Sequence, residues 1–194
     1  MMAPDYEKAR LKELIIDKAL VVRREPITLS SGQKTNHYYD LKKVLAHGEG
    51  LKLTGILMLE EMLKMGPVKS VGGLETGAIS ISVAISRESL EHENISWFFV
   101  RKQQKGHGLQ NMIEGNVLEP VVVVEDVITK GESVLKAIQV LQSKWKHMLG
   151  VVAIIDRGGG KENLQKKHKI KFASLFEDKD FEEVVKERLA KLNI

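Results

Sequence analysis

The sequence has no cysteine among its 194 residues, and aromatic side chains make up only 5% of it. Without cysteine there are no disulfides and no thiolate metal sites, which fits a reducing compartment. So few aromatic residues do not favour a stacking platform for single-stranded nucleic acid. No apolar run approaches the roughly 20 residues that a membrane helix needs. We therefore expect a cytoplasmic protein whose main partners are neither membranes nor nucleic acids.

The composition is that of an ordinary globular protein, with 43% apolar and 29% charged residues. The net charge of +4 is modest, and it can serve polyanionic small substrates as well as nucleic acid. This length predicts one domain with a full core. We expect residues 1–194 to form that domain, with a helix and a small hood in residues 1–45 and the core in residues 46–194.

One stretch, residues 121–134, reads VVVVEDVITKGESV. Four consecutive β-branched residues predict a strand that is buried on both faces of a parallel sheet. Glu125 and Asp126 follow at its carboxyl end, and then comes a glycine turn. The apolar residues after Ser133 have helical spacing, which predicts a helix packed against the sheet. The stretch is therefore predicted to be a strand, a turn and a helix.

Such a turn can bind an anion, because the first N–H groups of a helix are unpaired and carry the positive end of its dipole. Thr129 and Ser133 can add hydroxyl donors, and Gly131 allows close approach. The two acids can accept hydrogen bonds from sugar hydroxyls, directly or through Mg²⁺. A phosphorylated ribose fits the whole stretch. The structural alternative is an ordinary capped helix with solvated acids in the turn.

Strands and helices alternate through the rest of the chain. Apolar spacing predicts helices over residues 5–20, 48–65, 161–167 and 181–192, and a further helix directly after the turn at residues 72–77. Short strands are expected at residues 27–29, 37–41, 68–71, 96–100, 149–155 and 170–175. The first two would form an antiparallel hood. The others predict an α/β fold with a doubly wound, mostly parallel sheet, which binds ligands at the carboxyl ends of its strands.

The segment of residues 101–115, RKQQKGHGLQNMIEG, lies between two predicted buried strands. Arg101, Lys102, Lys105 and His107 fall within seven residues of one another, and they would repel each other unless an anion were present. A loop of about 15 residues without its own structure is often functional. The alternative is a solvated hairpin or linker.

Residues 121–134 resemble the 5-phosphoribosyl-1-pyrophosphate (PRPP) signature of type I phosphoribosyltransferases, in which two acids hold the ribose hydroxyls and the next turn wraps the 5′-phosphate. Lys130 and Glu132 depart from the usual small residues. Glu132 must therefore point to solvent or be offset by Lys130. Residues 72–80, GGLETGAIS, resemble the family's pyrophosphate loop, with Ala78 and Ser80 as departures. The resemblance implies that PRPP is bound by Glu75, Thr76, Gly77, Glu125, Asp126, Thr129, Lys130, Gly131, Glu132 and Ser133.

Residues 28–41, TLSSGQKTNHYYDL, resemble the N-terminal signature of orotate phosphoribosyltransferases. The segment of residues 101–115 is similar to the catalytic loop of the same family. Arg157, after a predicted strand, matches an arginine that pairs with the orotate carboxylate, as a guanidinium fork can. The implied orotate-binding residues are Ser31, Gly32, Tyr38, Tyr39, Thr129 and Arg157. Lys102, Lys105, His107 and Asp126 are implied to be catalytic, and Arg101, Lys102, Lys105 and His107 to bind PRPP. The two tyrosines could equally be half-buried strand aromatics.

The resemblance implies transfer of the 5-phosphoribosyl group from PRPP to orotate, which gives orotidine 5′-monophosphate and pyrophosphate in de novo pyrimidine (UMP) biosynthesis. It implies Mg²⁺ as the cofactor, held through PRPP and through water to Glu125 and Asp126, with no direct protein ligand assigned. It also implies a homodimer that shares the loop of residues 101–115 across its interface. The alternatives are transfer to another base, a PRPP-binding regulator, or an inactive relative.

Overall fold

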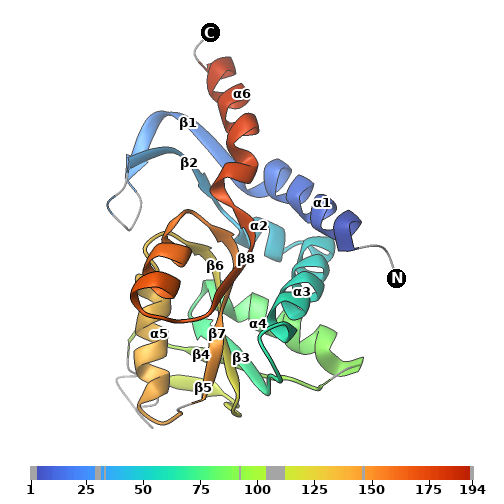
Figure 1. Ribbon diagram of the computed structural model, residues 1–194. Coiled ribbons are helices and arrows are strands. Elements are labelled where there is room, and N and C mark those ends of the chain that lie inside the picture. Colours follow the sequence, from blue (N-terminus) through green and yellow to red (C-terminus); the bar gives the residue numbers. More distant parts are fainter. Residues whose placement is uncertain are drawn as a thin grey trace.

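A six-stranded sheet forms the centre of the molecule, in the order β5-β4-β3-β6-β7-β8 (Figure 1). The computed structural model describes residues 4–28, 32, 34–91, 93–103, 112–145 and 147–192. The strands are β3 (Ser70–Leu74), β4 (Ser96–Val100), β5 (Ile113–Gly115), β6 (Val121–Ile128), β7 (Met148–Asp156) and β8 (Phe172–Glu177). All neighbours pair in parallel except β5, which runs antiparallel to β4. The predicted α/β class with a mostly parallel sheet is confirmed.

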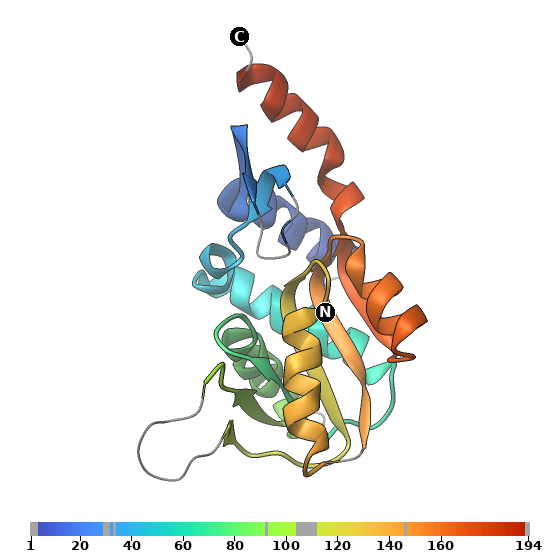
Figure 2. The same cartoon turned by 90° about the vertical axis from the view of Figure 1, so that its left-hand side faces the viewer.

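Helices cover both faces of this sheet, as the view in Figure 2 shows. One face carries α3 (Gly48–Leu63) and α4 (Gly77–Glu88), and the other carries α5 (Glu132–Gln142) and the π-helix η3 (Gly160–Lys167). Val122 and Val124 pack into the first core, whereas Val121 and Val123 pack into the second. The valine run is buried because successive side chains of one strand enter two different cores.

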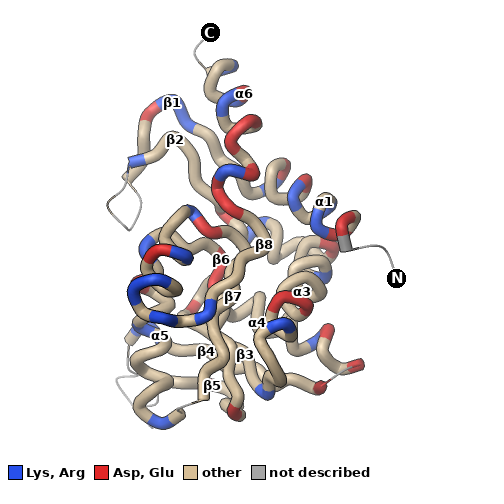
Figure 3. Tube along the Cα trace, viewed as in Figure 1, with Lys and Arg blue, Asp and Glu red and all other residues tan. Residues whose placement is uncertain are grey.

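Most of the remaining elements lie toward the two ends of the chain, and one 3-10 helix follows α4. They are α1 (Pro4–Leu14), the π-helix η1 (Ile15–Ala19), α2 (Lys42–Leu45), the 3-10 helices η2 (Ser89–Glu91) and η4 (Asp178–Phe181), and α6 (Glu182–Leu192). Charged residues lie mainly on the helices and the hood, while the sheet strands are largely uncharged (Figure 3). Among the described residues, no helix is long and apolar enough to cross a membrane.

The hood consists of two antiparallel strands, β1 (Leu20–Thr28) and β2 (Lys34–Tyr39). Its antiparallel pairing was predicted, but its boundaries were not. β1 begins at Leu20, where a helix was expected, and it continues through Pro26 because the register shifts between Val22 and Ile27. An irregular register tolerates a proline, which has no N–H to donate. Where Leu20 pairs with Tyr39, the Arg188 guanidinium of α6 donates to the carbonyls of Ile16 and Leu20 at 2.7 and 2.8 Å.

The boundaries of three core strands also differ from the prediction. Gly72 and Gly73 lie inside β3, where a turn was expected. Glycine is needed at both positions because neighbouring groups approach their backbones closely. A Cβ on Gly73 would lie 2.2 Å from the Val124 carbonyl oxygen. β6 continues to Ile128, so Glu125 and Asp126 lie within the strand and not after it. β8 covers residues 172–177 and not 170–175.

Candidate functional site

A cavity of about 480 Å³ opens at the carboxyl end of β6. It lies between the hood and the start of α5, so residues far apart in the sequence share its wall. Its lining comes from Ile27, Thr28, Tyr38 and Tyr39 of the hood, from the continuous run of residues 125–134, and from Arg157. The structure thus brings together most of the residues predicted to bind ribose, phosphate and base.

Glu125 and Asp126 form the floor of the cavity at the end of β6. Glu125 is buried, with 7% of its surface exposed, and its Oε1 accepts the Asp126 N–H at 3.1 Å. Burial, together with the adjacent charge of Asp126, raises the pKa of Glu125 well above its usual value. A protonated carboxyl can donate as well as accept a hydrogen bond. Both forms can therefore hold sugar hydroxyls, which are donors and acceptors themselves.

The predicted glycine turn is present at the start of α5. Gly131 has φ of 77° and ψ of 13°, a left-handed conformation that favours glycine. The first turn of α5, with Glu132, Ser133 and Val134, lies in the cavity wall. The N–H groups of a first helical turn have no partner within the helix, so this wall presents donors to an anion. Glu132 is exposed, in agreement with one of the two arrangements expected for it.

Residues 159–164 support this turn from behind. The Asn163 side-chain amide donates to the Lys130 carbonyl at 2.9 Å. Leu164 lies under Gly131, where a Cβ would approach its side chain to 3.2 Å. A Cβ on Gly159 would lie 1.3 Å from the Thr129 carbonyl oxygen, so only glycine fits. The sequence analysis missed these contacts, and the run of three glycines at residues 158–160 was the only local signal for them.

The second turn packs against the acids. A Cβ on Gly77 would lie 2.8 to 2.9 Å from the Asp126 carboxyl group, so this glycine lets the turn reach the end of β6. The peptide bond between Glu75 and Thr76 is cis. A carboxylate oxygen of Glu75 accepts the Lys102 N–H at 2.8 Å, which joins this turn to the cationic segment. Glu75, Thr76 and Gly77 border the floor but do not line the cavity.

The cationic segment is described only at its two ends. Arg101 donates its N–H to the Met112 carbonyl at 2.8 Å, and its guanidinium lies 3.6 Å from Glu114. Lys102 is exposed. Lys105 and His107 lie outside the described residues, as does Ser31 of the hood. The predicted loop of residues 101–115 is too long, because residues 113–115 pair with β4 as strand β5.

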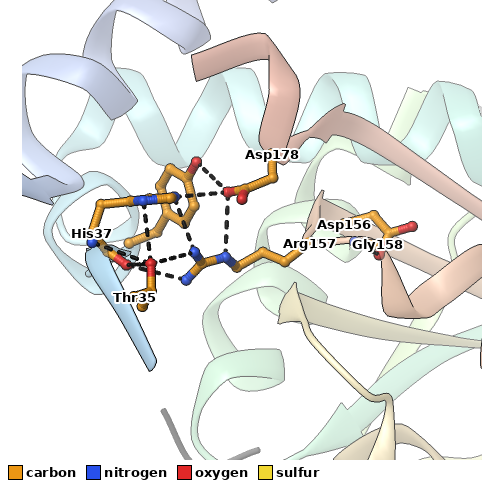
Figure 4. A network of polar contacts seen from close by, with 7 residues as sticks. Thr35, His37, Asp156, Arg157, Gly158 and Asp178 are labelled. Atoms are coloured by element: carbon orange, nitrogen blue, oxygen red, sulfur yellow. Dashed lines mark hydrogen bonds and ion pairs between the residues drawn. The ribbon is translucent and has the colours of Figure 1, made fainter. Parts of the chain in front are cut away.

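Next to the cavity, a polar network that the sequence did not indicate surrounds two of its lining residues, Tyr39 and Arg157 (Figure 4). Arg157 has a side chain that is only 4% exposed, and its Nε lies 3.3 Å from Asp178 Oδ1. Tyr39 donates its hydroxyl to the same oxygen at 2.8 Å, and His37 Nε2 lies 3.0 Å from it. Thr35 and His37 also contact the Arg157 guanidinium. Arg157 therefore lies where it was predicted, but among partners that were not expected.

Electrostatics reinforce this network. Burial would raise the pKa of Asp178, but hydrogen bonds from His37 and Tyr39 and the charge of Arg157 outweigh it and hold that pKa below its usual value. Burial, followed by the charge of Asp178, raises the pKa of the Tyr39 hydroxyl. Tyr38, the other predicted aromatic residue, is half-buried beside the Arg23 guanidinium. Gly32 is exposed, has φ of 80°, and does not line the cavity.

The acidic pair suits Mg²⁺ that arrives with a phosphate ligand. Among the described residues, no cluster of three or more His, Cys, Asp or Glu side chains could hold a metal by itself. Mg²⁺ usually keeps several waters and binds through one or two carboxylates plus substrate phosphates. Glu125 and Asp126 could provide such carboxylates, and the first turn of α5 lies beside them.

Solved structures place this architecture in a known class. The structure of orotate phosphoribosyltransferase from Mycobacterium tuberculosis H37Rv in complex with Fe(III) dicitrate matches with a TM-score of 0.72 and 32% identity, over 90% of this chain and 98% of that one. The same enzyme in complex with PRPP matches with a TM-score of 0.69 and 27% identity, over 93% of both chains. The fold is therefore that of a phosphoribosyltransferase.

Curated sequences define the family more closely. Orotate phosphoribosyltransferase from Aquifex aeolicus is 42% identical over 165 residues, which cover 82% of this chain and 90% of that protein. The enzyme from Rhodopirellula baltica is 36% identical over 188 residues, covering 91% and 97%. No protein-family model matches the chain. The chain belongs to the orotate phosphoribosyltransferase family.

Proposed function

We propose that this protein transfers the 5-phosphoribosyl group from PRPP to orotate, giving orotidine 5′-monophosphate and pyrophosphate in de novo pyrimidine biosynthesis. One observation carries the proposal. The acidic strand end, the glycine turn, the hood tyrosines and Arg157 all line a single cavity. A phosphorylated ribose and an acidic base can therefore be held side by side in it.

The ribose and its 5′-phosphate would lie along residues 125–134. Glu125 and Asp126 would hold the ribose hydroxyls, and the first turn of α5 with Thr129 and Ser133 would hold the phosphate. The Lys130 side chain is exposed and can offset the charge of Glu132 beside that phosphate. Mg²⁺, when bound with PRPP, would neutralise charge on the diphosphate. These contacts fix the sugar carbon that reacts relative to both of its partners.

The reaction breaks the bond between the ribose anomeric carbon and the diphosphate oxygen, and it forms a bond from the same carbon to a ring nitrogen of orotate, which gives up its proton. The sugar passes through an oxocarbenium-like state, so the protein must stabilise the departing diphosphate and exclude water. Lys102, Lys105 and His107 would close over the diphosphate, and one of them would protonate it. No nucleophilic side chain is needed.

The hood, in residues 1–45, would contribute the base pocket, while residues 46–194 would form the catalytic core. Tyr38 and Tyr39 support this division because both line the cavity. A homodimer that shares the segment of residues 101–115 and a cytoplasmic location are also part of the proposal. Analytical ultracentrifugation, followed by mixing of Lys102→Ala and Asp126→Asn subunits, would test whether two chains complete one active site.

The direct test mixes the protein with PRPP, Mg²⁺ and orotate and follows the loss of orotate absorbance, with uracil, adenine and hypoxanthine in parallel. We expect turnover with orotate alone, and loss of activity when Mg²⁺ is chelated. Turnover with another base would contradict the assigned substrate. PRPP binding without turnover of any base would favour a regulatory or inactive relative, and Lys130 and Glu132 would then be the residues to replace.

A further inference from the structure

The carboxylate of Asp178 does not line the cavity, but it pairs with Arg157, which does and which a substrate carboxylate would also be expected to seek. Asp178 begins η4, directly after β8. Its Oδ1 lies 3.3 Å from Arg157 Nε, 3.0 Å from His37 Nε2 and 2.8 Å from the Tyr39 hydroxyl (Figure 4). Three separate elements therefore meet at one carboxylate oxygen, and Arg157 is its cationic partner.

The Arg157 guanidinium has few free donors in this arrangement. Nη1 donates to the His37 carbonyl at 3.3 Å, and Nη2 donates to Thr35 Oγ1 at 3.2 Å. A guanidinium can hold a carboxylate through two parallel N–H groups, either the two Nη groups or Nε with one Nη. In this protein, both pairs of N–H groups already face protein acceptors. An incoming carboxylate can bind through either pair only if it displaces one of these acceptors.

Charge makes Asp178 the acceptor that matters most. Asp178 carries a negative charge, whereas the other two acceptors, Thr35 Oγ1 and the His37 carbonyl, are neutral. While Asp178 stays in place, a second carboxylate at Arg157 would share one cation with it and would be repelled by it. The low pKa of Asp178 keeps this charge present at neutral pH.

We propose that Asp178 is a specificity-determining residue that competes with the carboxylate of the base for Arg157. This inference rests on the proposed function, because it concerns the acidic base. Binding of that base exchanges Asp178 for the substrate at Arg157. Asp178 also holds Tyr39 and His37 of β2, so the exchange loosens one attachment of the hood, while Arg188 still holds the neighbouring strand at Leu20, the partner of Tyr39.

The test uses Asp178→Asn, which keeps an oxygen for the Tyr39 hydroxyl and removes the charge. Two ligands with the same ring are compared by calorimetry, namely orotate and its neutral methyl ester. We expect the variant to bind orotate about three- to tenfold more tightly than the wild type, the range given by one charge pair at a partly exposed site, with unchanged affinity for the ester. Asp178→Ser provides the same comparison if the amide variant does not fold.

Glu177→Gln is the matched control, because it removes the same charge one residue earlier, from a side chain paired with Lys161 and Lys179. We expect it to leave the ratio of orotate to ester affinity unchanged. Weaker or unchanged orotate binding by Asp178→Asn would overturn the inference, as would an equal gain in Glu177→Gln. Orotate turnover by the wild type tests the proposed function separately. If the wild type turns over orotate but Asp178→Asn leaves the ratio of orotate to ester affinity unchanged, the inference fails and the proposed function stands.

Discussion

The two ends of the cavity are built from different kinds of contact. At the ribose-phosphate end, which we define as residues 125–134 with their neighbours Gly77 and residues 159–164, glycines let backbones touch. At the base end, which we define as the lining residues Tyr39 and Arg157 with their neighbours Thr35, His37 and Asp178, hood side chains contact polar groups that lie 120 to 141 residues later in the sequence. The close backbone contacts cannot rearrange without moving the chain, whereas a side chain in the polar network can exchange one hydrogen-bond partner for another.

This difference has energetic consequences. An added methyl group that overlaps a backbone atom forces the chain itself to move, which typically costs about 1 to 3 kcal/mol and sometimes more. One hydrogen bond in a network contributes only about 0.5 to 1.5 kcal/mol, and water or a ligand can replace it. We therefore expect substitutions at the ribose-phosphate end to have the larger effects on stability.

The largest effect is expected for Gly159→Ala. Its Cβ would lie 1.3 Å from the Thr129 carbonyl oxygen, so either the phosphate turn or the segment after β7 must shift. We expect a loss of about 3 kcal/mol or more in the free energy of unfolding, together with loss of PRPP binding. Urea denaturation and calorimetry with PRPP measure the two effects.

Gly48→Ala is the control for that substitution, because nothing lies within 4 Å of its Cβ at the start of α3. We expect its stability to stay within about 1 kcal/mol of the wild type, on either side. If Gly159→Ala behaved like this control, the ribose-phosphate end would be as adaptable as the base end, and the contrast between them would fail.

The second prediction concerns Glu125, whose negative charge should lower the stability of the fold but favour PRPP binding. Its raised pKa means that the folded protein binds a proton there more tightly than the unfolded chain does. The resulting stability is full below about pH 4.3, the ordinary pKa of Glu, and is lost as the pH rises through the higher folded pKa. Glu125→Gln should remove this loss.

We expect Glu125→Gln to be about 1 to 2 kcal/mol more stable than the wild type above neutral pH, and nearly equal to it at pH 4. PRPP affinity should fall because the amide cannot provide a carboxylate to sugar hydroxyls or Mg²⁺. Thermal unfolding followed across this pH range is the measurement. A variant less stable than the wild type at high pH would show that the folded protein favours the charged form of Glu125.

The sequence predicted the ribose-phosphate end more completely than the base end, for a physical reason. Residues 121–134 are contiguous, so a buried strand, two acids and a glycine turn can be read from one local pattern. The extension of β6 past the acids was not predicted, since it depends on pairing with β7. Local patterns give the chemistry of a turn, whereas strand ends depend on the neighbouring strand.

The base end could be predicted only in part. Tyr38, Tyr39 and Arg157 were found through their resemblance to a family, but Asp178 was not. Nothing in the local sequence FEDKDF marks Asp178 among the neighbouring acids. Its role arises because the carboxyl ends of β7 and β8 lie side by side and bring it to Arg157 under the hood. Such a contact requires the folded topology.

A smaller effect is expected at the base end from Tyr39→Phe. The variant loses the hydroxyl that donates to Asp178 at 2.8 Å, while His37 and Arg157 remain as partners. We expect a loss of about 1 kcal/mol in the free energy of unfolding at pH 7. Asp178 has a lowered pKa, so its contribution is present above about pH 3.9 and disappears as the pH falls through the folded value.

The difference between Tyr39→Phe and the wild type should therefore shrink in acid, which urea denaturation at pH 7 and pH 3 can measure. Tyr38→Phe is the control because no hydrogen bond to Asp178 involves its hydroxyl. A loss of 3 kcal/mol or more for Tyr39→Phe is well above the usual value for one hydrogen bond. It would mean that substitutions at the base end reduce stability as much as those at the ribose-phosphate end.

The smallest effect is expected from Glu132→Gln, which removes one negative charge from the first turn of α5. Glu132 is exposed, so solvent and salt screen its repulsion of a phosphate in the cavity. We expect PRPP to bind less than about fivefold more tightly at low ionic strength, and the gain to vanish near 1 M salt, where the screening length is about 3 Å. Lys136→Gln, one turn further along the same helix, should have an effect of opposite sign and smaller size. A gain of about tenfold or more that persists in high salt would place the carboxylate against the phosphate, and unchanged affinity at every salt concentration would mean that Glu132 points away from it.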